Sequence, residues 1–196
     1  MNTLTQRKQA SKLVLAVALA TGTAMVAGHI VPDEAHAAKK KKKKKQKKAA
    51  EEYSDEWRAL FVPLEADFKE KGYEIPSFEQ RLDQVLILTK SNDEKLQTGQ
   101  LLYNVGLKSN DYERRAVGIK LMLESNKLPF DIVPQYNYIA YQIASRLENY
   151  DDALGYLDTA ISLNFQDANI SSADLLISKA TIYFDAERVN EGLDVL

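Results

Sequence analysis

The sequence of 196 residues predicts an all-α protein, and three observations lead to this prediction. From Glu51 onward, apolar residues recur every three or four positions, the spacing that gathers them on one face of a helix. No stretch alternates apolar and polar residues in the manner of a half-buried strand. The connections between the periodic segments are short and polar. We therefore expect seven or eight short helices that pack on one another.

The first periodic segment runs from Tyr53 to Phe68 and ends before Gly72, a residue type common just past helix ends. Pro63 lies inside this segment and predicts either a kink or two shorter helices. Two further helix starts show a serine followed three residues later by Gln or Glu, the pattern of a capping box. They are Ser77 with Gln80 and Ser91 with Glu94.

Apolar stripes at helical spacing continue through the second half of the chain, and each predicts one helix. A helix from Pro134 to Arg146 is among them. The stripes are formed by Ala116, Ile119 and Leu123; by Ile139, Ile143 and Leu147; by Ala153, Leu157, Ala160 and Ile161; and by Leu175 to Phe184.

The residues Asn149-Tyr150-Asp151-Asp152-Ala153-Leu154, and those that follow, resemble the second helix of a tetratricopeptide repeat (TPR). That family places a small residue early in this helix, a large apolar residue one turn later, and then alanine. Ala153, Leu157 and Ala160 occupy these positions. Small residues allow two antiparallel helices to approach closely. The chain departs from the family at Tyr141, where glycine is usual, and at Phe165, where proline is usual.

The same junction recurs weakly on either side. Asp111 to Ala116 resembles it with one additional residue before the alanine, and Glu187 to Leu196 resembles it with Gly192 at the small position. The small residues Ala116, Ala153 and Gly192 are 37 and 39 residues apart, against a family period of roughly 34. The excess residues fit in the loops around 128–134 and 164–172.

The resemblance covers about residues 96–196. It implies that residues 51–196 form antiparallel helix pairs stacked as a short, right-handed, TPR-like solenoid. The sequence stops inside what the resemblance makes a second helix, where solenoids usually carry a polar capping helix. Two explanations stay open: the repeats continue beyond residue 196 in a longer protein, or this end packs on a partner or a second copy.

In a solenoid of this type, the first helices of the pairs line a concave surface that binds a protein or peptide. The resemblance therefore implies a partner-binding groove on the helices that begin near Pro134 and Ser172. The alternative is that Tyr138 packs in the core and that the polar residues are ordinary solvent contacts. The candidate groove residues are Gln135, Tyr138, Gln142, Arg146, Asp174 and Thr181.

The first 37 residues read as a secretory signal peptide. Arg7, Lys8 and Lys12 precede an apolar run from Leu13 to Val31, and a site of the small–x–small type follows. Signal cleavage at Ala35-His36-Ala37 would leave Ala38 as the new N-terminus. This predicts a periplasmic or secreted protein. The alternative is a membrane anchor, because an uncleaved run of 19 residues is nearly long enough to span a bilayer.

Residues 38–50 form a lysine-rich linker, for which we expect disorder. Nine lysines and one glutamine occupy Lys39 to Lys48, and their mutual repulsion prevents a packed core. Residues 49–196 carry 14 lysines and arginines against 26 aspartates and glutamates, a net charge of −12. The folded part should therefore repel nucleic acid, whereas the lysine arm is either a solvated spacer or a contact to an anionic membrane or another polyanion.

The residue inventory argues against catalysis. The chain has no cysteine, and its two histidines, His29 and His36, both fall within the predicted signal peptide. No acid–base constellation or glycine-rich phosphate loop is evident, so we expect no enzyme activity, no cofactor and no metal. The sequence favours an exported scaffold or adaptor of the bacterial cell envelope. The alternative is an envelope-associated structural protein attached through its lysine arm, and self-association is open in either case.

Overall fold

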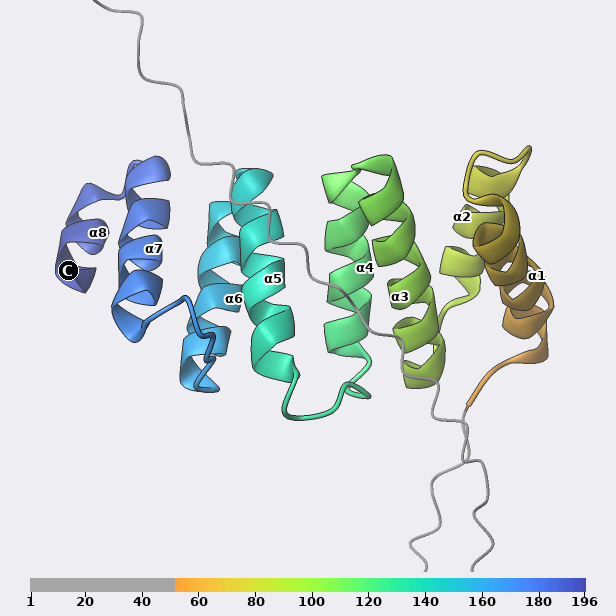
Figure 1. Cartoon of the computed structure of the whole chain (residues 1–196), viewed down its shortest axis with the longest axis horizontal. Coiled ribbons are helices and arrows are strands. Elements are labelled where there is room, and N and C mark those ends of the chain that lie inside the picture. The colour runs from red at the N-terminus through yellow and green to blue at the C-terminus, as the bar shows by residue number, and fades with distance from the viewer. Residues whose placement is uncertain (1–51) are drawn as a thin grey trace, which may run out of the picture. The chain divides into compact units, whose positions relative to one another are not determined.

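A computed structural model describes residues 52–196 (Figure 1). Between these residues the chain forms helices and no strand, which confirms the all-α prediction. None of the described helices is both long and apolar enough to cross a membrane. The predicted signal peptide, with Ala35, Ala37 and Ala38, and the lysine arm lie outside the described residues. The eight helices are α1 (Asp55–Lys71), α2 (Phe78–Leu88), α3 (Asn92–Ser109), α4 (Tyr112–Glu124), α5 (Val133–Arg146), α6 (Tyr150–Ser162), α7 (Ser172–Asp185) and α8 (Val189–Val195).

Neighbouring helices pack in pairs, α1 with α2, α3 with α4, α5 with α6 and α7 with α8 (Figure 1). Contacts of α4 with α5 and of α6 with α7 join successive pairs, and α1 also contacts α3. The apolar interior is accordingly divided into three clusters rather than gathered in one core. The first contains Trp57, Phe61, Phe78, Leu82 and Leu101, the second Ile119, Met122, Ala140 and Ile143, and the third Ala153, Leu157, Leu175 and Ile182.

Helix α1 is a single helix that continues through Pro63, where the sequence predicted a kink or a break. Pro63 is exposed, while the buried residues Trp57, Phe61, Leu64 and Phe68 form one uninterrupted stripe on the other face. Tertiary packing of this stripe stabilises the helix across the proline, although proline removes one backbone hydrogen bond.

One of the two predicted capping boxes is confirmed and the other is wrong. The Ser91 hydroxyl accepts from the backbone N–H of Glu94, and the Glu94 carboxylate accepts from the backbone N–H of Ser91. Ser77 has φ 64°, in the left-handed region, and its side chain caps nothing. A capping serine needs an extended backbone to reach the first free N–H groups, so the left-handed conformation removes the cap.

The turns α3–α4, α5–α6 and α7–α8 share one backbone geometry. In each, one residue takes a positive φ between 57° and 61°, and the next residue donates its N–H to a carbonyl of the preceding helix at 2.8–2.9 Å. This is the Schellman arrangement, which satisfies carbonyls left free at a helix end. The left-handed residues are Asn110, Glu148 and Glu187, and the bonds run from Asp111 to Gly106, from Asn149 to Ala144 and from Arg188 to Tyr183.

Candidate partner-binding surface

The turns at Asn110, Glu148 and Glu187 lie within helix pairs and provide a common origin for comparing α3, α5 and α7; the same geometry also ends α6, at Asn164. Counting back from the left-handed residue of each turn gives equivalent positions on the three helices, and the residues predicted for the groove on α5 and α7 fall on the same positions. In turn order, the sets are Gln97, Gln100, Asn104 and Lys108 on α3; Gln135, Tyr138, Gln142 and Arg146 on α5; and Asp174, Ile177, Thr181 and Asp185 on α7.

Most side chains of these sets are exposed, with Gln97 and Tyr138 half-buried. The Tyr138 ring stacks on Phe165 at a centroid distance of 4.4 Å and meets Tyr141 at 5.3 Å. It packs against the third apolar cluster, and this burial raises the pKa of its phenol. Tyr138 therefore contributes to packing, which was the alternative interpretation of this residue.

Asp174 of the α7 set acts electrostatically on Tyr138 of the α5 set. Burial is the main cause of the raised pKa of the Tyr138 phenol, and the Asp174 carboxylate adds to it. Asp174 also closes a capping box at the start of α7, because its Oδ2 accepts from Ser171 Oγ at 2.6 Å and from the Ser171 N–H at 2.8 Å. These bonds hold the pKa of Asp174 below its ordinary value, so it stays charged at neutral pH.

At the end of the surface nearest the turns, the α3 and α5 sets present cations. The Arg146 guanidinium lies 4.2 Å from the Tyr112 ring centroid, and Arg115 lies 4.3 Å from the same ring. Lys108 Nζ lies 4.4 Å from the Phe68 ring centroid. These rings orient the cations without neutralising them. The equivalent residue of α7 is Asp185, so the sign of the charge changes along this row.

Helix α3 carries a set at the same turn positions, which the sequence analysis did not assign to the candidate groove. Gln100 and Asn104 are exposed and equivalent to Tyr138 and Gln142, but no groove residue was assigned before residue 135. The sequence does contain an indication of this set. Aligning the junction at Asp111 with the one at Asn149 would have added α3 to the candidate groove. Together α3 and α5 carry five carboxamides on this surface: Gln97, Gln100, Asn104, Gln135 and Gln142.

The predicted small residues of α6 and α8 lie at helix contacts. Ala153, Leu157 and Ala160 have no exposed surface. Gly192 is buried, and a Cβ added there would approach the Phe184 ring to 2.4 Å. The small side chains of Ala153, Ala160 and Gly192 therefore allow close helix packing, and the larger Leu157 fills the apolar cluster.

Ala116 differs from this pattern, since it is only half-buried. The residue of α4 equivalent to Ala153 is Arg115, the fourth residue after the helix cap in both helices. Arg115 fits because the facing residue of α3 is Gly106, whose added Cβ would lie 2.8 Å from Arg115 Cγ. The close approach of α3 and α4 occurs instead at Gly118, where an added Cβ would lie 2.7 Å from the Gly99 carbonyl oxygen.

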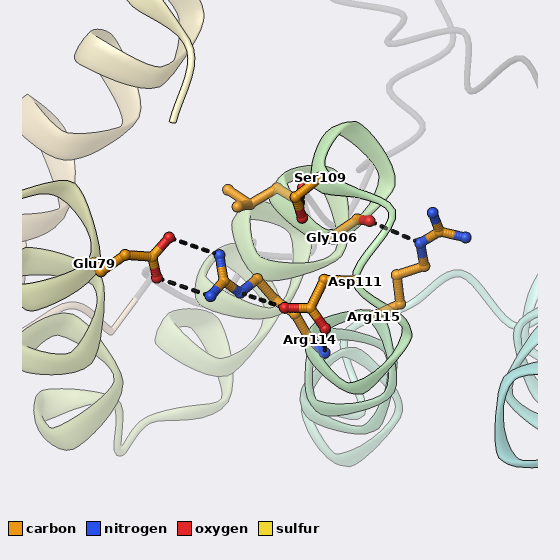
Figure 2. Close-up of polar contacts among 7 residues, drawn as sticks. Glu79, Gly106, Ser109, Asp111, Arg114 and Arg115 are labelled. Carbon is orange, nitrogen blue, oxygen red and sulfur yellow. Dashed lines mark hydrogen bonds and ion pairs between the residues drawn. The ribbon is translucent and has the colours of Figure 1, made fainter. Parts of the chain in front are cut away.

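Figure 2 shows how polar contacts fix the α3–α4 turn. Arg115 Nε donates to the Gly106 carbonyl at 2.9 Å, and Asp111 Oδ1 caps α4 by accepting from the Arg114 N–H at 2.9 Å. The Arg114 guanidinium donates to both oxygens of Glu79 on α2, at 2.9 Å and 2.8 Å. This two-bond ion pair joins α4 to the first helix pair.

A second polar network joins the start of α1 to the start of α3. Glu94 is 2% exposed, and its carboxylate accepts from Ser54 N and Oγ, Lys90 N and Ser91 N at 2.7–2.9 Å. Burial alone would raise the pKa of this carboxyl, but the four donors outweigh it and lower the pKa to about 2. Beside it, Asp93 accepts from Glu52 N at 2.9 Å and from Lys127 Nζ at 3.1 Å. These carboxylates stabilise the fold.

Between residues 52 and 196, no group of three or more His, Cys, Asp or Glu side chains is arranged to hold a metal ion. No protein family, no curated protein and no solved structure matches the chain.

Proposed function

We propose that residues 52–196 are TPR-like stacked helix pairs and that the protein is an exported adaptor of the bacterial cell envelope. In this proposal, a protein or peptide segment binds across the surface formed by α3, α5 and α7. The observation that carries it is the shared turn geometry at Asn110, Glu148 and Glu187, since it puts solvent-facing polar side chains at equivalent positions on three helices.

The chemistry of this surface suits the backbone of an extended segment. Each carboxamide offers two N–H donors and one acceptor oxygen, which matches the N–H and C=O groups of a peptide that has no secondary structure of its own. Lys108 on α3 and Arg146 on α5 favour a carboxylate on the segment, while Asp174 and Asp185 on α7 favour a cation. The proposed ligand is therefore an extended peptide with charges of opposite sign at its two ends.

Selection from a random peptide library, followed by titration of the selected peptides, tests this proposal. The variant Gln100→Ala/Asn104→Ala/Gln142→Ala removes three exposed carboxamides, and each lost hydrogen bond costs about 1 kcal/mol. We expect the affinity to fall at least tenfold. The matched control is Gln166→Ala/Asn169→Ala, which changes exposed carboxamides in the α6–α7 loop and should bind like the parent. Equal affinity in both variants would refute the surface.

Export is part of the same proposal and rests on Ala35-His36-Ala37. N-terminal sequencing of the protein from the cell envelope should begin at Ala38. Recovery of an intact Met1 in the membrane pellet would instead support the anchor.

The lysine content of residues 39–48 favours a second candidate function, a structural protein held on an anionic surface of the envelope. The two candidates differ in one measurement. A peptide ligand should remain bound after the arm is removed, whereas attachment to anionic vesicles should be lost with it.

A further inference from the structure

The connection between α6 and α7 contains a motif that plays no part in the proposed peptide binding. This connection, residues 163–171, is the longest between the described helices and ends at the cap of α7. Within it, Asn169-Ile170-Ser171 has the pattern Asn-x-Ser/Thr, in which the asparagine of an exported protein accepts an oligosaccharide when x is not proline. No other asparagine of the chain is followed two residues later by serine or threonine.

The backbone presents Asn169 on an exposed turn. Asp167 and Ile170 form an isolated bridge, in which the Ile170 N–H donates to the Asp167 carbonyl at 3.3 Å. The Asn169 N–H donates to Asp167 Oδ1 at 2.8 Å, which closes the same turn a second time. The Asn169 side chain is exposed, and within residues 52–196 no hydrogen bond engages its carboxamide. Its Nδ2 is therefore open to a reagent that approaches from solvent.

Ser171 supplies the hydroxyl that a glycosyl-transferring enzyme recognises beside the asparagine, and it is also exposed. Its Oγ donates to Asp174 Oδ2 at 2.6 Å and accepts from the Asp174 N–H at 3.2 Å. Both bonds are exposed and belong to the first turn of α7, and helix ends open locally more easily than a core. The hydroxyl can therefore exchange Asp174 for an enzyme while the buried Leu175 and Ile182 stay packed.

We propose that Asn169 is an N-glycosylation site and that its substrate is an oligosaccharide linked to a lipid through pyrophosphate. In the transfer, Asn169 Nδ2 forms a bond to the anomeric carbon of the first sugar, and the bond from that carbon to the pyrophosphate oxygen breaks. The lipid pyrophosphate leaves with the bonding electrons, and a base of the transferase takes one proton of the amide. In the cell this modification rests on the export that belongs to the proposed function.

A cell-free reaction on the complete chain tests the site without requiring export. The purified chain is incubated with an oligosaccharyltransferase and a polyprenyl-pyrophosphate-linked oligosaccharide, and mass spectrometry follows the tryptic peptide 147–179. Asn169→Gln removes the acceptor, Ser171→Ala removes the hydroxyl, and Ser171→Thr retains it. The matched controls are Asn164→Gln and Ser172→Ala, which change exposed residues of the same types outside the motif. Circular dichroism checks that every variant is folded.

We expect the parent, Ser171→Thr and both controls to gain the mass of the oligosaccharide on this peptide, and Asn169→Gln to gain none. Ser171→Ala should react at least about a hundredfold more slowly, because an enzyme site built to bind a hydroxyl discriminates strongly against its loss. A synthetic peptide of residues 163–174 provides the motif without the fold.

Product on the synthetic peptide but none on the chain would show that the fold shields Asn169, and it overturns the proposal. Absence of product on both, or a parent-like reaction of Asn169→Gln, overturns it as well. Since the reaction needs no export, its failure refutes the site alone. Retention of the chain inside the cell would refute export and leave the cell-free result standing.

Discussion

Neutralising Glu94 is the sharpest test of how α1 is held to α3. Its carboxylate accepts four hydrogen bonds, two of them from Ser54, which precedes α1. Glu94→Gln keeps the shape but replaces one acceptor oxygen by an NH₂ group that faces donors. Hydrogen bonds to a charged group are worth about 1.5–3 kcal/mol each, and a glutamine oxygen recovers some of them. We therefore expect the variant to lose about 2–3 kcal/mol of unfolding free energy at pH 7.

The shifted pKa of Glu94 determines in which direction the unfolding free energy changes with pH. The Glu94 pKa is about 2 in the folded chain against an ordinary 4.5, so the folded state favours the ionised carboxylate. Its stabilisation is present above pH 4.5 and is lost as the pH falls from 4.5 towards 2. Over the whole interval the loss is about 3 kcal/mol, and by pH 3 it is about 2 kcal/mol. Glutamine does not titrate, so the gap between parent and variant should close by that amount.

Urea unfolding followed by tryptophan fluorescence measures this gap. Trp57 is the single tryptophan of the chain, and its Nε1 donates to Thr98 of α3 at 3.0 Å, so it reports on the same contact. Circular dichroism on the same samples shows whether the remaining helices unfold with it. Glu113→Gln, at an exposed glutamate of α4, is the matched control and should leave the gap near zero. A gap of constant size from pH 7 to pH 3 would refute the role assigned to the Glu94 carboxylate.

Three further predictions concern packing and the arm. Ala153→Leu and Ala160→Leu should each lower the unfolding free energy by about 1–3 kcal/mol through overpacking, and denaturant melts like that of the parent would contradict the register of α6. Gly118→Ala should destabilise by a similar amount, because its Cβ would lie 2.5 Å from the Tyr103 nitrogen, whereas Gly155→Ala meets nothing within 4 Å and should stabilise by about 0.5–1 kcal/mol. Deleting residues 38–50 should leave the melting temperature unchanged and abolish salt-sensitive flotation with anionic vesicles; unfolding would show that the arm is structural.

The sequence predicted the helices well and some of their contacts poorly, for a physical reason. Burial of Ala153 and Leu157 follows from periodicity within one helix, which one stretch of sequence contains. Arginine can occupy position 115 of α4, where α6 has alanine, because the facing residue of α3 is Gly106. Glycine has no side chain, and this leaves room for the arginine. A large residue at a small position is acceptable only when its neighbour in space compensates. Inspecting either helix alone therefore does not reveal that Arg115, and not Ala116, stands at the position equivalent to Ala153.

The regularity of residues 96–196 lies in the backbone of the turns more than in their side chains. The left-handed position is asparagine in one turn and glutamate in two, although glycine is the usual residue there. Backbone atoms make the bonds that define the turn, so the side chain is constrained only by the cost of a positive φ, on the order of 1 kcal/mol. A comparison of sequences detects similar side chains, so it detects a repeated backbone geometry only weakly. For the same reason, α3, α5 and α7 correspond in the positions of their residues relative to the turns and not in their residue types.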